Sequence, residues 1–271
     1  MKNEGILKSN QTKGWRMGLK NLLDREMGKW WQTSRWCTQT LVWGLITNGV
    51  LGLLLFLLPF LTATFEGINQ AELADIPDGT TAFFSLAGIA MPIGVVVLVQ
   101  GSIITEKELG TAEWVLSKPV SRSAFVLSKL IAHSLGFFIT YVVFQTSIAY
   151  VMISNSQGSP QTLLGFIKGA GILTLILFFY LTLTLMMEVL VDSRSIVLGV
   201  TLGAALGGAL LVNLFPFFAL ITPFAMPNLI PLIVMETTLP EYLIWLPFFC
   251  TFIMCLIFIT ISLWRFNKKS L

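Results

Sequence analysis

Six runs of about 20 apolar residues constrain the fold of this chain more than any other feature of its sequence. An α-helix needs about 20 residues to cross a hydrocarbon layer roughly 30 Å thick. Of the 271 residues, 55% are apolar and 11% are charged, whereas an average soluble domain has roughly 25% charged residues. We therefore predict an all-α integral membrane protein, a single transmembrane domain over residues 1–271. The predicted spans are 41–61, 83–104, 130–153, 169–190, 196–215 and 242–264.

The basic residues predict how these spans are oriented. Six spans place both termini on one side of the membrane, and of the 17 lysines and arginines only Lys168 then falls on the opposite side. Positively charged loops are retained in the cytoplasm. We expect a multi-pass protein of the cell membrane whose N- and C-termini are both cytoplasmic.

Residues 14–35 predict an amphipathic helix that lies along the membrane surface. Tryptophan flanked by lysine and arginine is typical of helices in the headgroup region. Glu26 interrupts the apolar face of this helix, so its amphipathic character is imperfect. The apolar face consists of Trp15, Leu19, Leu22, Leu23, Met27 and Trp30.

The segment between the last two spans, 216–240, is strongly apolar but contains five prolines. Proline ends or kinks helices. The segment therefore predicts short re-entrant helices that dip into the outer leaflet without crossing it. The prolines are Pro216, Pro223, Pro227, Pro231 and Pro240.

A polar insert, 106–129, separates the second and third spans. Gly110 permits a break, Thr111 can cap a new short helix, and Pro119 ends that helix. Ser121 can then cap the third span. Trp114, Val115 and Leu116 would give the short helix an apolar face, although a generic solvated loop is an equal alternative on these grounds.

The same insert resembles the segment between spans two and three in type-two export permeases of the ATP-binding-cassette (ABC) transporters. Members show an acidic residue, Glu-x-Gly-Thr, an apolar pair, Ser-x-Pro-Val-Ser-Arg, and a lysine entering the next helix. Arg25 and Glu26 also resemble the family's N-terminal segment. The matching positions in the insert are Glu106, Glu108, Gly110, Thr111, Leu116, Ser117, Pro119, Val120, Ser121, Arg122 and Lys129.

The resemblance implies that residues 106–122 contain a coupling helix, which sits in a groove of the ATPase subunit and transmits its motion. The chain would then form half of the translocation pathway of an ATP-driven exporter in a bacterial plasma membrane. Its partners would be two copies of the ATPase subunit and either a second copy of this permease or a sister permease. The expected coupling residues are Glu106, Glu108, Gly110, Thr111, Trp114, Ser117, Pro119 and Arg122.

Motifs that the sequence lacks also bear on function. There is no GxxxxGK[ST] phosphate-binding loop, so we expect ATP and Mg²⁺ to be bound by the partner subunit and this chain to contain no catalytic residues and no cofactor. The three cysteines form no pattern typical of a metal site. The small net charge of +3 does not favour a nucleic-acid partner.

Polar residues inside the spans are candidates for a substrate path. Gln100, Gln145 and Asn213 are the main ones, with hydrogen bonding between helices as the alternative, which is favoured for Gln145. Glu188 is expected to reach water at the end of the fourth span, and His133 to be a satisfied histidine at a helix end.

Span five carries Gly199, Gly203 and Gly207 at four-residue spacing. Such a stripe lets another helix approach closely, either within this chain or across a dimer interface. Just before it, residues 191–195 contain Asp192 or Ser193 as a cap for the fifth helix, with a second ATPase contact as the alternative.

Two other function classes stay open. A secondary transporter or channel would require charged groups near the bilayer midplane and an internal repeat, which the sequence does not favour. A non-transporting immunity or anchoring protein, which binds an ATPase or a toxin without pumping, is compatible with the same pattern of spans.

Overall fold

Long apolar helices make up most of this protein in the computed structural model, which describes residues 14, 16–64, 78–156, 162–237 and 240–268. Within these residues the chain forms helices and no strands. Five helical stretches are long and apolar enough to cross a membrane. The prediction of an all-α, multi-pass membrane protein is confirmed at this level.

The first three of these stretches contain interruptions of the α-helix. Arg35–Leu61 begins with α2 (Arg35–Trp43) and continues through the π-helical η1 (Gly44–Gly49), α3 (Val50–Gly52), the π-helical η2 (Leu53–Leu57) and α4 (Leu58–Thr64). Gly79–Glu108 comprises α6 (Gly79–Val99) and, after a break, α7 (Ile104–Glu108). Arg122–Ser156 comprises α9 (Arg122–Phe137), the π-helical η3 (Phe138–Val143) and α10 (Phe144–Ser156).

The other two stretches are α11 (Leu163–Leu190) and Tyr242–Lys268 of α15 (Glu241–Lys268). The predicted fifth span corresponds to α12 (Arg194–Leu214). The apolar stretch within α12 covers Arg194–Gly208 and is shorter than each of the five candidate spans. The structure therefore supports five candidate spans, and the sixth crossing stays a prediction.

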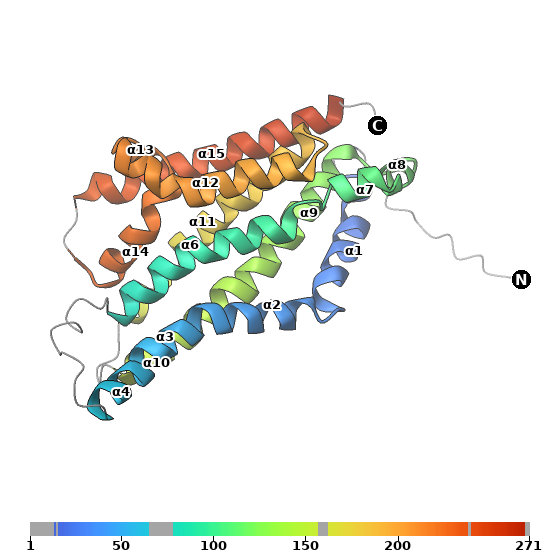
Figure 1. Ribbon diagram of the computed structural model, residues 1–271. Coiled ribbons are helices and arrows are strands. Elements are labelled where there is room, and N and C mark those ends of the chain that lie inside the picture. Colours follow the sequence, from blue (N-terminus) through green and yellow to red (C-terminus); the bar gives the residue numbers. More distant parts are fainter. Residues whose placement is uncertain (1–13, 15, 65–77, 157–161, 238–239, 269–271) are drawn as a thin grey trace, which may run out of the picture.

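Three shorter helices in the proline-rich segment and two helices at one end of the bundle complete the fold. The proline-rich segment forms α13 (Phe218–Ile221), the 3₁₀-helix η4 (Pro223–Ala225) and α14 (Met226–Val234), and α14 packs on α6 and α11. α1 (Leu19–Trp31) and α8 (Thr111–Leu116) lie together with α7 at one end of the bundle (Figure 1).

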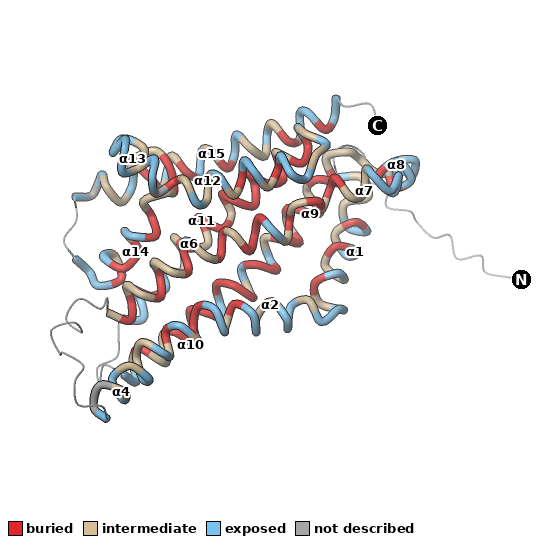
Figure 2. The backbone as a smooth tube through the Cα atoms, in the orientation of Figure 1, coloured by how far each residue is buried: buried red, intermediate tan, exposed pale blue. Residues whose placement is uncertain are grey.

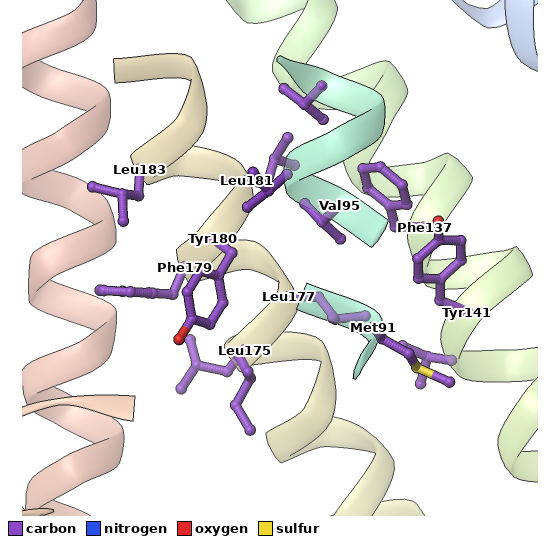
Figure 3. Close-up of a cluster of buried hydrophobic side chains, with 14 of the residues drawn as sticks. Met91, Val95, Phe137, Tyr141, Leu175, Leu177, Phe179, Tyr180, Leu181 and Leu183 are labelled. Atoms are coloured by element: carbon purple, nitrogen blue, oxygen red, sulfur yellow. The ribbon is translucent and has the colours of Figure 1, made fainter. Parts of the chain in front are cut away.

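The core lies around α6 and α11, with α9 beside them. Figure 2 shows buried positions running along these helices, whereas much of α12 and α15 is exposed. Side chains from α6, α9, η3 and α11 gather in one apolar cluster, which includes Met91, Val95, Tyr141 and Leu177 (Figure 3). The sequence of α11 has almost no polar face, as is typical of a helix that is buried on both faces.

The glycine stripe of α12 contacts none of the residues that the structure describes. A Cβ atom built on Gly199, Gly203 or Gly207 would meet no described atom within 4 Å. Close helix contact occurs instead at Gly94 of α6, where a Cβ would collide with the Trp43 ring. Of the two alternatives for the stripe, packing inside the chain is therefore not observed among the described residues.

Candidate functional site

Five charged side chains from three helices meet at the end of the bundle that carries α8. α1 provides Arg25, Glu26 and Lys29, α7 provides Glu106, and α9 provides Lys129. Figure 1 shows α1, α7 and α9 converging at this end. We call these five residues the charge cluster.

Lys129 lies at the centre of the charge cluster. Its Nζ atom is 2.8 Å from Oε1 of Glu106 and 3.4 Å from Oε1 of Glu26. Its side chain is 1% exposed. A buried ammonium group without a partner is strongly destabilising, so this lysine requires its carboxylates in place. The pairing fixes the positions of α1 and α7 relative to α9.

Lys29 and Arg25 close the charge cluster on its solvent side. Nζ of Lys29 is 2.9 Å from both carboxylate oxygens of Glu26 and 3.1 Å from Oε1 of Glu106. Nη2 of Arg25 is 2.8 Å from Oε1 of Glu26 and 3.2 Å from both oxygens of Glu106. Each carboxylate is therefore shared by three cations.

The cations change the ionisation of Glu26. Burial alone would raise the pKa of Glu26, but the charge of Lys129 and the charge and hydrogen bond of Lys29 lower this pKa from 4.5 to about 2. Burial lowers the pKa of Arg25, but Glu106 and Glu26 raise it to a net value above the ordinary one. Both groups stay charged near neutral pH, so Glu26 and Arg25 act as an electrostatic tether rather than as a proton donor or acceptor.

α1 reaches the cluster by packing on α9 through Trp30. The Trp30 side chain is 1% exposed, and its Nε1 atom donates to Nδ1 of His133 at 3.4 Å. Its ring meets Phe137 edge-on. A Cβ on Gly136 would lie 2.5 Å from the Trp30 ring, so the glycine makes room for the indole. His133 is therefore the satisfied histidine that the sequence predicts.

The apolar face predicted to lie on the membrane surface is buried against protein instead. Leu22, Glu26 and Trp30 are the buried residues of α1. The helix is also shorter than the predicted range of 14–35, and Trp15 lies outside the described residues. Glu26, which interrupts the apolar face in the sequence, is the point where α1 attaches to Lys129. The prediction missed this role because a carboxylate on an apolar face was interpreted as an imperfection, when it signals a buried partner.

A buried carboxylate from α11 holds the start of α7. Glu188 accepts hydrogen bonds from the backbone N–H groups of Ser102 and Ile103 and from the Ser102 hydroxyl. These groups lie at the break between α6 and α7, where Gly101 has a φ of 90°. Glu188 is 0% exposed, so the expectation that it reaches water is wrong: the unpaired N–H groups at the helix start bind it instead.

The end of α7 and the start of α8 turn on Gly110, which has a φ of 67°. Thr111 does not cap α8, contrary to prediction. Gly110 occupies the capping position, and the Thr111 hydroxyl donates to the carbonyl oxygen of Glu106 at 3.1 Å. Ser121 does cap α9, because its Oγ accepts from the N–H of Ala124 at 3.0 Å.

α8 has one buried and one exposed face. Ala112 and Val115 are buried, whereas Trp114 is 63% exposed and lies under Nζ of Lys118, which is 3.5 Å from the ring centre. Trp114 and Val115 therefore do not share an apolar face as predicted, since adjacent helical residues point in different directions. The Leu116 side chain lies outside the described residues.

Two further ion pairs join α7 to the segment before α12 and to the first residue of α12. Nζ of Lys107 is 3.3 Å from Oδ1 of Asp192, and Arg194 pairs with Glu108. Ser193 occupies the N-cap position of α12 but makes no capping side-chain hydrogen bond, so the predicted Ser193 cap is not observed. Asp192 is engaged with Lys107 instead.

The remaining predicted coupling residues lie around α8. The Ser117 hydroxyl donates to the carbonyl oxygen of Trp114 at 2.8 Å, and Pro119 is exposed. Arg122 donates through Nη1 to the carbonyl oxygen of Asn267 at 3.3 Å, near the end of α15. Glu106 and Glu108 thus hold α7 to the bundle, and Arg122 joins the start of α9 to α15. Trp114 is exposed on α8.

The candidate residues of the substrate path do not come together. Gln145 is fully buried, accepts from Asn48 at 2.8 Å, and donates to the carbonyl oxygens of Thr40 and Thr140. The contacts with Asn48 and Thr40 are the interhelical hydrogen bonds of the favoured alternative. Gln100 lines a cavity of about 240 Å³ next to the charge cluster, and Asn213 is exposed on α12.

A family model described as "Protein of unknown function (DUF2705)" matches residues 40–271. The chain belongs to this family. No curated protein matches the chain. The family region begins within α2, so it includes Glu106, Lys129 and the ion pairs to Asp192 and Arg194, whereas α1 lies before it.

Proposed function

We propose that this member of the DUF2705 family is the membrane-spanning subunit of an ATP-driven exporter, and that α7 and α8 are the part that contacts a separate ATPase. One observation carries the proposal. Trp114 of α8 and Leu109, between α7 and α8, are exposed (63% and 70%), while ion pairs attach α7 to three different parts of the bundle.

These ion pairs would make α7 and α8 move as one rigid unit with the helices to which α7 is attached. Glu106 joins it to α1 and α9 through Lys29 and Lys129. Lys107 and Glu108 join it to the start of α12 through Asp192 and Arg194. A push on Trp114 would therefore be passed mainly to α1 and α9, because the ion pairs of the buried Lys129 resist separation. The pairs with Asp192 and Arg194 are more exposed and would add less. This is the behaviour that the resemblance to type-two ABC permeases implies.

The proposed topology has six spans, with α12 as the fifth. Arg194 at its start pairs with Glu108 at the charge-cluster end. The chain that follows α12 leads to Val234 of α14, whose carbonyl oxygen lies beside Gly165, near the other end of α11. Because the start of α12 and the segment that follows it lie at opposite ends of the bundle, α12 is compatible with a membrane crossing. The end with the charge cluster would be cytoplasmic, in a bacterial plasma membrane.

A second permease copy, or a sister permease, would complete the pathway. The stripe formed by Gly199, Gly203 and Gly207 supports contact along α12, because no described atom fills the space above these glycines and such stripes allow helices to pack closely in membranes. ATP and Mg²⁺ would be bound by the ATPase partner.

Co-purification with an ABC ATPase encoded beside this gene tests the proposal. Trp114→Ala should reduce the amount of retained ATPase about tenfold, because tryptophans dominate binding energy at protein interfaces. Trp245→Ala is the matched control, since Trp245 is 55% exposed but lies near the start of α15, away from α8. Equal retention by both variants, or no retention by the wild-type chain, would contradict the proposal. Retention without any effect of the permease on ATP hydrolysis would favour the anchoring alternative.

A further inference from the structure

A groove lies at the opposite end of the bundle from the charge cluster. Its volume is about 460 Å³, within the range of about 300 to 1,000 Å³ that is common for ligand pockets. α11 contributes Lys168 and Gly171, α14 contributes Leu229, and α15 contributes Trp245 and Phe248. Among the described residues that line the groove, Lys168 alone is charged.

The sequence of α11 opens this groove. Lys168, Gly171 and Ile172 have the three- and four-residue spacing that places them on one helix face. A Cβ on Gly171 would meet nothing within 4 Å, so the absent side chain leaves the space empty. On the other side of the groove, Pro247 removes a backbone hydrogen bond within α15.

The position of Lys168 indicates the level of the groove in a membrane. Lys168 lies in the second turn of α11 and Trp245 in the second turn of α15. Both side chains are exposed, and lysine and tryptophan near the ends of spans lie at the headgroup level. The apolar walls formed by Ile172 and Phe248 continue from that level toward the middle of the span.

We propose that this groove binds an anionic phospholipid. The ammonium group of Lys168 would contact the phosphate, and one acyl chain would lie over Gly171 between α14 and α15. Charge complementarity supports this occupant, because among the described side chains no carboxylate forms an ion pair with Lys168. The walls are otherwise apolar, and each buried CH₂ group of a lipid chain adds affinity. The inference does not depend on an ATPase partner.

Photolabelling in nanodiscs tests the site. The full chain is placed in phosphatidylcholine nanodiscs with a small fraction of phosphatidylglycerol that carries a diazirine in its acyl chain. After illumination, peptide mass spectrometry locates the label. We expect label near Leu229 and Phe248, and Lys168→Gln should reduce it about fivefold, because one lysine near a membrane surface contributes roughly 1 kcal/mol toward an anionic lipid. Lys168→Arg should retain the label.

Gly171 provides a second, steric test. Gly171→Phe should fill the groove and remove the label there, whereas Gly171→Ala should keep it, since a methyl group meets open space. Label on the exposed face of α12, at Leu206 and Leu210, should stay unchanged in all variants. Equal labelling of the groove in the Gly171→Phe and wild-type chains would overturn the proposal. Equal competition by unlabelled phosphatidylcholine and phosphatidylglycerol would also overturn it, by removing the preference for an anionic headgroup.

Discussion

Lys129 is the residue on which the arrangement of α1, α7 and α9 depends most. It is 1% exposed and its two carboxylate partners come from different helices. Buried ion pairs add little net stability compared with apolar packing, but removing one partner leaves a costly unpaired charge. The charge cluster therefore specifies how these helices align more than it stabilises the fold.

Replacement of Lys129 should expose that dependence. Lys129→Met leaves Glu26 and Glu106 with only the partly exposed Lys29 and Arg25, and we expect a loss of about 3 kcal/mol in the free energy of unfolding, the low end for a broken buried pair. Thermal unfolding in detergent measures it. Lys20→Met, at an exposed position on α1, is the matched control and should change little. A similar loss in both variants would contradict the central role of Lys129.

The lowered pKa of Glu26 predicts a dependence of stability on pH. Because the pKa is about 2 in the folded protein and 4.5 ordinarily, the stabilisation is complete above pH 4.5 and is lost as the pH falls toward 2. The unfolding temperature should therefore fall more steeply across this window in the wild type than in Glu26→Gln. Glu113→Gln, which changes an exposed carboxylate of α8, should keep the wild-type profile. Parallel curves for the wild type and Glu26→Gln would exclude this contribution.

At the scale of elements, the attachment of α1 to α9 rests on the close fit of Trp30 over Gly136. The indole lies where a Cβ would be, at 2.5 Å. The turn before α1 adds a backbone bond, because the N–H of Ser121 donates to the carbonyl oxygen of Met17 at 3.0 Å. α1 is therefore part of the bundle and not an independent surface helix.

Gly136→Ala should separate α1 from α9. Overpacking at such a contact costs about 1–3 kcal/mol, and we expect a lower unfolding temperature together with faster proteolysis after Lys29 or Arg35. Gly171→Ala on α11 is the control, because its Cβ would meet open space, and a better helix former should leave stability unchanged or raise it by up to about 1 kcal/mol. If both alanine variants unfold at the wild-type temperature, the contact is less close than described.

At the scale of the whole molecule, the described basic side chains gather at one end while Lys168 lies at the other. Glu188, near the end of α11, contacts Ser102 beside the charge cluster. Lys168 lies about five turns earlier along α11 and is therefore distant from the charge cluster. This separation in space corresponds to the uneven distribution of lysines and arginines between the two sets of loops in the sequence.

Cysteine labelling should distinguish six spans from five. In a background without Cys37, Cys250 and Cys255, Ser117→Cys and Thr237→Cys each place one thiol at an exposed position. With α12 as a span, a membrane-impermeant reagent added to intact cells should label position 237 and reach position 117 only after permeabilisation. If α12 does not cross, both positions would react under the same condition.

Much of the fold was predictable because long apolar runs have few alternatives in a membrane, and the Ser121 cap follows from local chemistry. The partners in the charge cluster were harder to predict. Glu26 and Lys129 are about a hundred residues apart, and one sequence does not show which charges meet. The close-packing glycines were missed for the same reason: the regular stripe at Gly199 and Gly203 is open, whereas the isolated Gly94 and Gly136 contact tryptophans.

Site-specific photocrosslinking tests whether the exposed side of α8 contacts an ATPase. A photoreactive amino acid replaces Trp114 in one variant and Trp245 in another, and both are illuminated in intact cells that produce the neighbouring ATPase. We expect a covalent adduct between permease and ATPase with the probe at position 114 and none with the probe at position 245. No adduct at position 114, or equal adducts at both positions, would contradict the proposed contact.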